Sequence, residues 1–407
     1  MQWLKEIPSH WEVRKMKYCF SERSEKNHPD EPILCATQSQ GVIPQSMYAN
    51  RVVVVNKGFE GLKLVKKGDF VISLRSFEGG IEYAYYQGII SAAYTILQPN
   101  KDSFSNYWKV LFKSHPFIQL LQTCVTGIRE GQNINYSMLC RAFLPLPPLA
   151  EQEKIVSYLE DKTSKIDAYV ADKEKEIELL QELKQKTIAD AVTKGLNPNA
   201  KMKDSGISWI GEIPEHWEVK QLRSFLTLFT EKGHGDAQLL SVTREQGVIE
   251  RDKEDKEENH NFVPDDLSGY KYIEKGDFAI NKMKAWQGSY AVSEYDGIVS
   301  PAYFTCKLKG VNKDFFSKAI RSKLYVPFFT QYSKGIRVGQ WDLNPNALKS
   351  IPFFLPPSDE QQAIVVYIEE KCEKIDKLAS ELQSEIDYLK EYKQRLIADC
   401  VTGQVKV

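Results

Sequence analysis

The sequence has few of the residues that build metal centres or disulfide frameworks. Seven cysteines and six histidines are spread over 407 residues. No Cys-x-x-Cys pair and no other zinc-ligand spacing occurs among them. An odd number of scattered cysteines is typical of a reduced chain, so we expect free thiols and a cytoplasmic location. A disulfide scaffold and a zinc module are therefore excluded.

Long apolar runs are also missing. No stretch approaches the roughly 20 apolar residues that a membrane-spanning helix needs. The first residues, Met1 to Glu6, lack the basic-then-apolar layout of a secretory signal. We therefore expect no association with a membrane and no secretion.

The common catalytic signatures are absent as well. There is no Gly-x-x-x-x-Gly-Lys-Ser/Thr loop, no convincing dinucleotide fingerprint and no His-Glu-x-x-His pair. Each Pro-Pro pair, at 147–148 and 356–357, follows a leucine. An adenine methyltransferase would need a polar residue there to hold the flipped base. We predict no catalytic residue, no metal and no cofactor in this chain, with an enzyme of an unrecognised type as one open alternative.

What the sequence does contain is a long internal repeat. Residues 7–13 read Ile-Pro-Ser-His-Trp-Glu-Val, and residues 213–219 read Ile-Pro-Glu-His-Trp-Glu-Val. Pro-Pro-Leu-Ala-Glu-Gln at 147–152 returns as Pro-Pro-Ser-Asp-Glu-Gln at 356–361. A nearly constant long period indicates two copies of one structural module.

Each copy begins with a mixed segment. Short β-branched and aromatic runs bounded by Gly, Asn and Asp predict strands joined by turns. A helix is expected over 106–122 and again over 313–332. We predict two similar globular domains of α/β or α+β class, at residues 1–148 and 196–357.

Each copy ends in a long charged stretch without Gly or Pro, at 149–194 and 358–402. Apolar residues in both stretches recur mostly at gaps of 3, 4 or 7, which is a helical stripe between Glu- and Lys-rich faces. Gly195 and Gly403 are suitable helix ends. We predict long helices at 149–195 and 358–407. Two such stripes most simply pack on each other, as an antiparallel coiled coil with one domain near each end and a pseudo-twofold repeat.

Charge is distributed unevenly although the net charge is only −1. Residues 151–194 carry 8 basic and 11 acidic side chains, and residues 359–400 carry 6 and 11. Residues 1–150 carry 17 basic against 12 acidic. The acidic excess thus lies on the predicted helices, and the remainder is mildly basic, which is compatible with a nucleic-acid partner.

The motif Gly-Ile-Arg-x-Gly-Gln occurs once in each copy, at 127–132 and 335–340. Arginine offers a rigid fork of donors for a phosphate or a guanine edge, and glutamine can pair with an adenine edge. A glycine-bounded turn with a surface arginine explains the repeat equally well. The first candidate DNA contacts are Arg129, Gln132, Arg337 and Gln340.

A second candidate is a loop that differs between the copies while its flanks agree. Lys-Met-Lys-Ala-Trp-Gln at 282–287 corresponds to Leu-Arg-Ser-Phe-Glu-Gly at 74–79. Recognition loops on a common frame would differ in this way, although ordinary loop divergence is the alternative. The candidate contacts here are Arg75, Lys282, Lys284, Trp286 and Gln287. The repeated His10 and His216 are expected to be packing corners, because neither has a nucleophile or metal partner.

The chain resembles the specificity subunit of type I restriction–modification enzymes. The resemblance is carried by residues 209–219, Trp-Ile-Gly-Glu-Ile-Pro-Glu-His-Trp-Glu-Val, by residues 144–155, Leu-Pro-Leu-Pro-Pro-Leu-Ala-Glu-Gln-Glu-Lys-Ile, and by their second copies. It covers essentially the whole chain. It implies two target-recognition domains that each read one half of a bipartite double-stranded DNA site.

The resemblance also implies partners. Two methyltransferase (modification) subunits would bind S-adenosylmethionine, and restriction subunits would translocate and cut DNA with ATP and Mg²⁺. The long helices would set the spacer and dock the partners. A helix of about 44 residues spans roughly 66 Å, which is about two turns of B-DNA. The rival interpretation is a coiled-coil scaffold that binds proteins alone.

Overall fold

The computed structural model describes residues 3–4, 6–49, 58–100, 104–127, 133–252, 264, 266–335 and 341–407. The chain forms two compact units, one made of Met1–Glu174 with Gln383–Val407 and the other of Lys175–Leu382. Each unit therefore contains a globular part and a portion of both long helices. Sequence analysis had placed boundaries at the helix ends.

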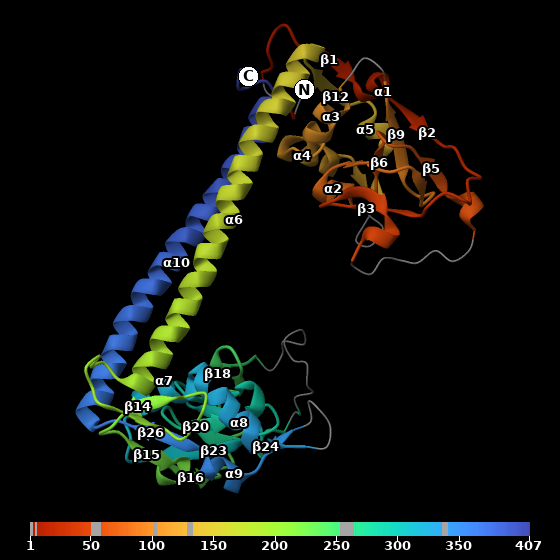
Figure 1. Ribbon diagram of the computed structural model, residues 1–407. Helices are drawn as coiled ribbons and strands as arrows, with labels where there is room; N and C mark the ends of the chain where they lie inside the picture. The colour runs from red at the N-terminus through yellow and green to blue at the C-terminus, as the bar shows by residue number, and fades with distance from the viewer. Residues whose placement is uncertain are drawn as a thin grey trace. The chain divides into compact units, whose positions relative to one another are not determined.

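The first unit is built around a four-stranded antiparallel sheet in the order β2-β9-β6-β7 (Figure 1). Four two-stranded ladders, β1–β12, β3–β4, β5–β8 and β10–β11, surround it. The strands are β1 (Glu12–Lys15), β2 (Phe20–Arg23), β3 (Leu34–Thr37), β4 (Gly41–Pro44), β5 (Lys63–Val65), β6 (Phe70–Ile72), β7 (Glu82–Tyr83), β8 (Gly88–Ile90), β9 (Thr95–Pro99), β10 (Val125–Thr126), β11 (Asn133–Ile134) and β12 (Phe143–Leu146).

Short helices cover this sheet and enclose an aromatic core. Phe20 meets Phe70 and Trp108 edge-to-face with ring centroids 5.9 and 5.3 Å apart. Such pairs add to the free energy gained from burial. The helices are α1 (Met16–Cys19), η1 (Gln45–Met47), η2 (Phe59–Gly61), α2 (Ser76–Gly79), α3 (Ser105–Leu111), α4 (His115–Thr123) and α5 (Tyr136–Leu139).

The second unit repeats this architecture, with a four-stranded sheet in the order β16-β23-β20-β21. Its two-stranded ladders are β13–β14, β15–β26, β17–β18, β19–β22 and β24–β25. The strands are β13 (Met202–Asp204), β14 (Glu212–Pro214), β15 (Glu218–Gln221), β16 (Leu226–Phe229), β17 (Leu240–Thr243), β18 (Gly247–Glu250), β19 (Lys271–Ile273), β20 (Phe278–Ile280), β21 (Tyr290–Val292), β22 (Gly297–Val299), β23 (Phe304–Leu308), β24 (Ser333–Lys334), β25 (Asp342–Leu343) and β26 (Pro352–Leu355).

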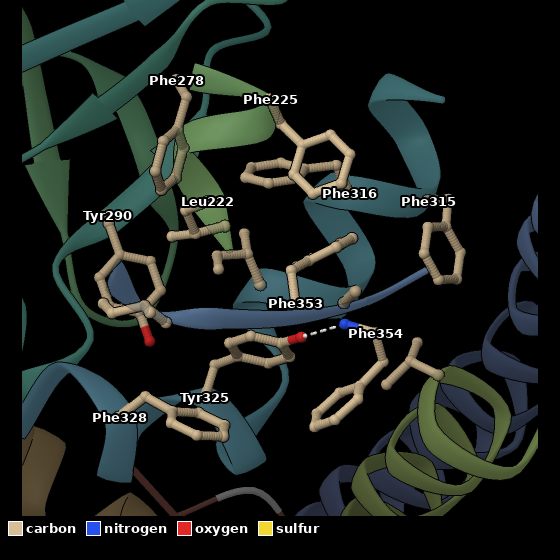
Figure 2. Close-up of a cluster of buried hydrophobic side chains, with 14 of the residues drawn as sticks. Leu222, Phe225, Phe278, Tyr290, Phe315, Phe316, Tyr325, Phe328, Phe353 and Phe354 are labelled. Atoms are coloured by element: carbon tan, nitrogen blue, oxygen red, sulfur yellow. Dashed lines mark hydrogen bonds between the residues drawn. The ribbon is translucent and has the colours of Figure 1, made fainter. Parts of the chain in front are cut away.

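Its core is also aromatic, and Figure 2 shows the rings gathered on both sides of β26. Phe353 lies 5.1 Å from Phe316 between ring centroids, and the buried Tyr325 hydroxyl accepts the backbone N–H of Phe354 at 3.4 Å. The helices are η4 (Leu222–Ser224), η5 (Ala285–Gln287), α7 (Lys313–Arg321), η6 (Lys323–Tyr325), α8 (Val326–Tyr332) and α9 (Pro345–Ser350).

All ladders between these strands are antiparallel, so of the two predicted classes the described part of the chain is α+β. The predicted helices at 106–122 and 313–332 exist, but the prediction of one continuous helix in each was wrong. Pro116 and Pro327 lie early in α4 and α8. A proline ring clashes with the carbonyl four residues earlier, so the chain must start a new helix.

The two long helices are α6 (Leu149–Lys194) and α10 (Ser358–Val401), and each begins directly after a Pro-Pro pair. They run antiparallel within each unit (Figure 1). In the first unit Lys393 Nζ lies 2.6 Å from an Asp167 carboxylate oxygen. In the second, Lys184 Nζ lies 2.7 Å from Asp376. The predicted apolar stripe is largely buried or half-buried, with Leu183 as an exposed exception.

Glycines end both long helices for a physical reason. Gly195 and Gly403 have φ angles of 71° and 73°, in the left-handed region that favours glycine after a helix. A Cβ on Gly195 would lie 3.3 Å from the Trp217 ring and 2.6 Å from a Glu360 oxygen. A Cβ on Gly403 would collide with Pro8. Each helix end thus packs against an Ile-Pro-x-His-Trp motif of its own unit.

Candidate functional site

The repeated motifs at the two ends of each copy contact each other. His10 Nε2 lies 2.9 Å from Glu151 Oε2 in the first unit, and His216 Nε2 lies 2.8 Å from Glu360 Oε2 in the second. In the second unit Trp217 Nε1 also donates to Glu360 at 3.1 Å. The His-Trp motif therefore holds the first turn of a long helix, in agreement with the predicted packing corner.

The glutamine that follows this glutamate is buried in both units. Gln152 accepts the backbone N–H of Phe104 at 3.0 Å and donates to the Pro147 carbonyl at 2.8 Å. Gln361 accepts from Asn312 N at 2.9 Å and donates to Pro356 O at 2.9 Å. The Glu-Gln pair therefore fixes the start of α6 and α10 against the globular part.

The predicted loop of the second unit is a fixed structure with an exposed tip. Lys282 Nζ lies 3.0 Å from Asp342 Oδ2, and the rings of Trp286 and Trp341 lie 5.2 Å apart between centroids. Lys284 and the neighbouring Met283 are exposed, while Trp286 and Gln287 are half-buried. Lys282 and Trp286 thus hold the loop against the neighbouring residues Asp342 and Trp341, whereas Lys284 is left at the surface.

The corresponding segment of the first unit is folded differently. Arg75 is exposed and immediately precedes α2, whose Ser76 hydroxyl accepts the backbone N–H of Ser73 at 2.9 Å. Where the second unit has the single 3₁₀ turn η5, the first has a short α-helical turn. The remaining candidates, Arg129, Gln132, Arg337 and Gln340, lie outside the described residues.

In each unit a basic residue that was not among the predicted contacts connects the divergent loop, at 74–79 or 282–287, to a neighbouring β-hairpin, β3–β4 or β17–β18. In the first unit Lys113 Nζ donates to the carbonyls of Gln38 and Gly79 at 3.2 and 2.9 Å. In the second, Arg321 donates to the carbonyls of Arg244 and Gly288 at 2.9 and 3.0 Å. We call this feature the cation clamp.

The two clamp residues occupy equivalent positions. Each lies at or just beyond the end of the helix that follows the backbone N–H bound by the buried glutamine. An alignment of the two copies would have placed Lys113 opposite Arg321, and two basic residues at one position is a signal that could have been found.

The second unit has a hollow of about 660 Å³ beside its clamp. The half-buried loop residues Trp286 and Gln287 lie in its wall with Arg321. The other lining residues are Gln185, Arg244, Glu245, Gly288, Tyr290, Lys323, Val326 and Pro327.

Among the described residues, no group of three or more His, Cys, Asp or Glu side chains is placed to hold a metal ion. No helix in the described part of the chain is long and apolar enough to span a membrane.

Comparison with known proteins gives one consistent family. Residues 7–179 match the family model of the type I restriction modification DNA specificity domain. The chain is 25% identical over 423 aligned residues to a Methanocaldococcus jannaschii protein assigned as the type I restriction enzyme MjaX specificity subunit, covering 99% of this chain and 95% of that one. It is 24% identical to the EcoKI specificity subunit of Escherichia coli, covering 76% and 68%.

Solved structures share the fold. The HsdS subunit from Thermoanaerobacter tengcongensis aligns with a TM-score of 0.54 at 14% identity over 98% of this chain and 99% of that chain. A chain from the structure of complex assembly and conformational transition of the type I R-M system aligns with a TM-score of 0.68 at 15% identity, over 98% and 100%. Family model, relatives and fold point to the same group of proteins, and the chain is similar along essentially its whole length to type I restriction–modification specificity subunits.

Proposed function

We propose that this chain is the DNA sequence-specificity subunit of a type I restriction–modification complex, with each unit reading one half of a bipartite double-stranded site. The observation that carries the proposal is a common frame with divergent loops. The strands, the clamp and the helix-start contacts repeat between the units, whereas the segments around Arg75 and Lys284 do not. Phosphate contacts would position each unit, and loop side chains would read base edges.

We further propose that the helices dock two methyltransferase subunits, one on each unit. Both units leave large apolar side chains exposed on α6 and α10. In the first unit they include Tyr169, Tyr388 and Tyr392. In the second they include Leu179, Leu183 and Leu378. Exposed apolar groups of this kind support a protein interface.

The chemistry would belong to those partners. S-adenosylmethionine would be bound by the methyltransferase subunits, and ATP and Mg²⁺ by the restriction subunits, with this chain supplying recognition and no catalytic group. The alternative of a coiled-coil scaffold that binds only proteins is disfavoured by the DNA specificity domain that residues 7–179 match.

A single substitution tests the reading role. Lys284→Ala is expected to weaken binding of the chain, together with its methyltransferase, to duplexes carrying one of the two half-sites and to leave the other half-site unaffected. Lys275→Ala is the matched control, because Lys275 is an exposed lysine of the same unit that lies in a turn and on neither long helix. An equal loss of affinity for a scrambled duplex would indicate that Lys284 contacts a phosphate and not a base. Unchanged binding to every duplex would remove it from the interface.

A second experiment tests the helices as spacers. Seven residues inserted after Glu174 in α6 and seven before Gln383 in α10 preserve the apolar stripe, because the stripe repeats every seven residues. The insertions add roughly 10 Å of helix, which corresponds to about three base pairs. A map of methylated sites should then show a longer spacer between unchanged half-sites. An unchanged spacer would contradict a role for the helices in setting it.

A further inference from the structure

The cation clamps of the two units differ in how their charge is balanced. In the first unit Lys113 Nζ lies 2.5 Å from Glu82 Oε1, and Glu82 is 3% exposed. In the strand register, Glu82 pairs with Val71 on β6, and Ala291 pairs with Ala279 at the same position on β20. Alanine therefore replaces the clamp's carboxylate in the second unit.

Arg321 is consequently a half-buried cation held by carbonyls. Besides Arg244 and Gly288, it donates to the carbonyls of Glu245 and Tyr290 at 2.8 and 3.3 Å. Within the described part of the chain, no carboxylate lies within 4.0 Å of its guanidinium. Burial lowers the pKa of Arg321, which reflects the cost of holding the charge away from water.

This cation faces the hollow of about 660 Å³, and the rest of the lining adds to its charge. Arg244, Arg321 and Lys323 are opposed there by one acid, Glu245. Glu245 lies 3.2 Å from Arg244 Nε, and its side chain is 81% exposed, so water screens it well. The lining thus carries a net charge of +2, three basic residues against one acidic.

A hollow with this net charge favours a small anion as its occupant. Tyr290 also lies in the wall, but its hydroxyl is buried and is not offered to that occupant.

We propose that this hollow holds a backbone phosphate of the half-site bound by the second unit, and that the neutralised clamp of the first unit has no equivalent. The proposal rests on the proposed DNA-reading function. Lys323 and Arg244 would contact the phosphate directly, while Arg321, whose terminal N–H groups serve the carbonyls, supplies charge. The phosphate would then fix the position of the loop carrying Lys284 on the duplex.

The test transfers the carboxylate of the first unit into the second. Ala291 lies beside Gly247, and a Cβ built on Gly247 would be 2.9 Å from Ala291 Cβ and 4.0 Å from Arg321 Nε. A carboxylate at position 291 can therefore reach the guanidinium. Ala291→Glu should pair with Arg321 and lower the net charge of the lining from +2 to +1, whereas Ala291→Gln adds a similar volume without charge.

Binding of the full chain with its methyltransferase to duplex DNA is measured over a range of salt concentrations. Each phosphate contact contributes about 0.9 to the slope of log affinity against log salt. Ala291→Glu should lower that slope by about 0.9 relative to Ala291→Gln and weaken binding severalfold, on specific and scrambled duplexes alike. Lys323→Gln, a change at an exposed residue, should lower it similarly and decides the matter if Ala291→Glu alone reduces the melting temperature.

Equal slopes for Ala291→Glu and Ala291→Gln in folded protein, or an unchanged slope for Lys323→Gln, would overturn the phosphate site while leaving the DNA-reading function intact. Failure of the proposed function would appear differently, as wild-type protein that gives no sequence-dependent binding at all.

Discussion

The two units share a backbone fold, but the cation that pairs with an equivalent buried aspartate comes from a different strand in each. The sequence Lys-Gly-Asp-Phe occurs in both units, at residues 67–70 and 275–278, and its aspartate is 2% exposed in both. Asp69 receives Arg23 Nε from β2 at 2.7 Å, whereas Asp277 receives Lys307 Nζ from β23 at 2.9 Å. Both units bury a carboxylate at this turn and pair it with a cation, which comes from β23, the neighbour of β20, in the second unit and from β2, one strand beyond the neighbour of β6, in the first.

The clamps extend this comparison. The first unit pairs Lys113 with Glu82, and the second leaves Arg321 among carbonyls. Both units keep a basic residue that joins the hairpin to the loop, whereas the position of its carboxylate partner differs, with Glu82 in one unit and Ala291 in the other. At positions such as this last one, two copies of a module can acquire different binding properties.

The largest expected difference in stability is between variants that remove the cation paired with each buried aspartate, Arg23 for Asp69 and Lys307 for Asp277. Arg23→Met should cost about 3–5 kcal/mol of the free energy of unfolding of the first unit, because it leaves Asp69 buried without its cation. The Arg23 side chain is 8% exposed, whereas that of Lys307 is 37% exposed. Lys307→Met should therefore cost clearly less in the second unit. Hydrogen exchange of the β6 and β20 amides measures each unit separately, and equal losses would contradict the distinction.

Lys113→Met should destabilise the first unit by about 2 kcal/mol at neutral pH, because a buried carboxylate loses its partner. Burial raises the pKa of Glu82, and Lys113 partly opposes that rise. A raised folded pKa adds stability below the ordinary pKa of glutamate, and this stability is lost as the pH rises through the folded value. Without Lys113 the folded pKa of Glu82 should rise further.

The penalty of Lys113→Met should consequently shrink as the pH falls toward 4, where Glu82 is protonated. Urea unfolding at pH 4 and pH 7 measures this, and Lys113→Arg is the conservative control. A penalty that stays constant between the two pH values would show that Lys113 acts through packing alone.

The glycines that end the long helices give a smaller effect. Gly403→Ala and Gly195→Ala should each cost about 1–2 kcal/mol through the left-handed backbone. Gly403→Ala should cost more, because the rigid Pro8 ring blocks the new methyl group, whereas at Gly195 the end of the Glu360 side chain can move. Gly206→Ala is the control, since φ is 75° and nothing lies within 4 Å of the added Cβ. Thermal unfolding measures the three variants, and identical losses would exclude the contact with Pro8.

The smallest effect is expected at the histidine corners. His10→Ala and His216→Ala should each cost less than about 1 kcal/mol, because exposed ion pairs contribute little. Glu360 keeps a bond from Trp217 when His216 is removed, whereas Trp11 Nε1 has no partner among the described residues. The loss should therefore be slightly larger for His10. Loss of site-specific methylation in correctly folded His variants would argue against a structural role.

Much of the fold could be predicted from the sequence because the signals for it are local. The Pro-Pro starts, the glycine ends and the spacing of apolar residues predicted α6 and α10 within a few residues. The continuous helix expected over 106–122 failed because the pattern of apolar residues does not register a steric clash at Pro116. The exposed Leu183 shows a similar limit, since an apolar residue in the stripe need not face the neighbouring helix.

The residues of the candidate site could be predicted only in part from the sequence. Sequence comparison selected the loop with Lys284 because its flanks repeat, but it passed over Arg321, which lies more than thirty residues beyond the loop. The selection of Arg129 and Arg337 remains a prediction. Each clamp joins three separate segments, the one that carries the basic residue and two that supply its partners, and no local pattern records which segments meet.

By itself, the sequence determined that the chain is a duplicated module and where its long helices lie, because repetition, capping and apolar spacing can be recognised along the chain without knowing which distant segments meet. Only the tertiary structure decided which charges are balanced. Glu82 reaches Lys113 across the sheet while Ala291 leaves Arg321 without a carboxylate, and such pairings depend on strand register and helix position, which arise when distant segments pack together.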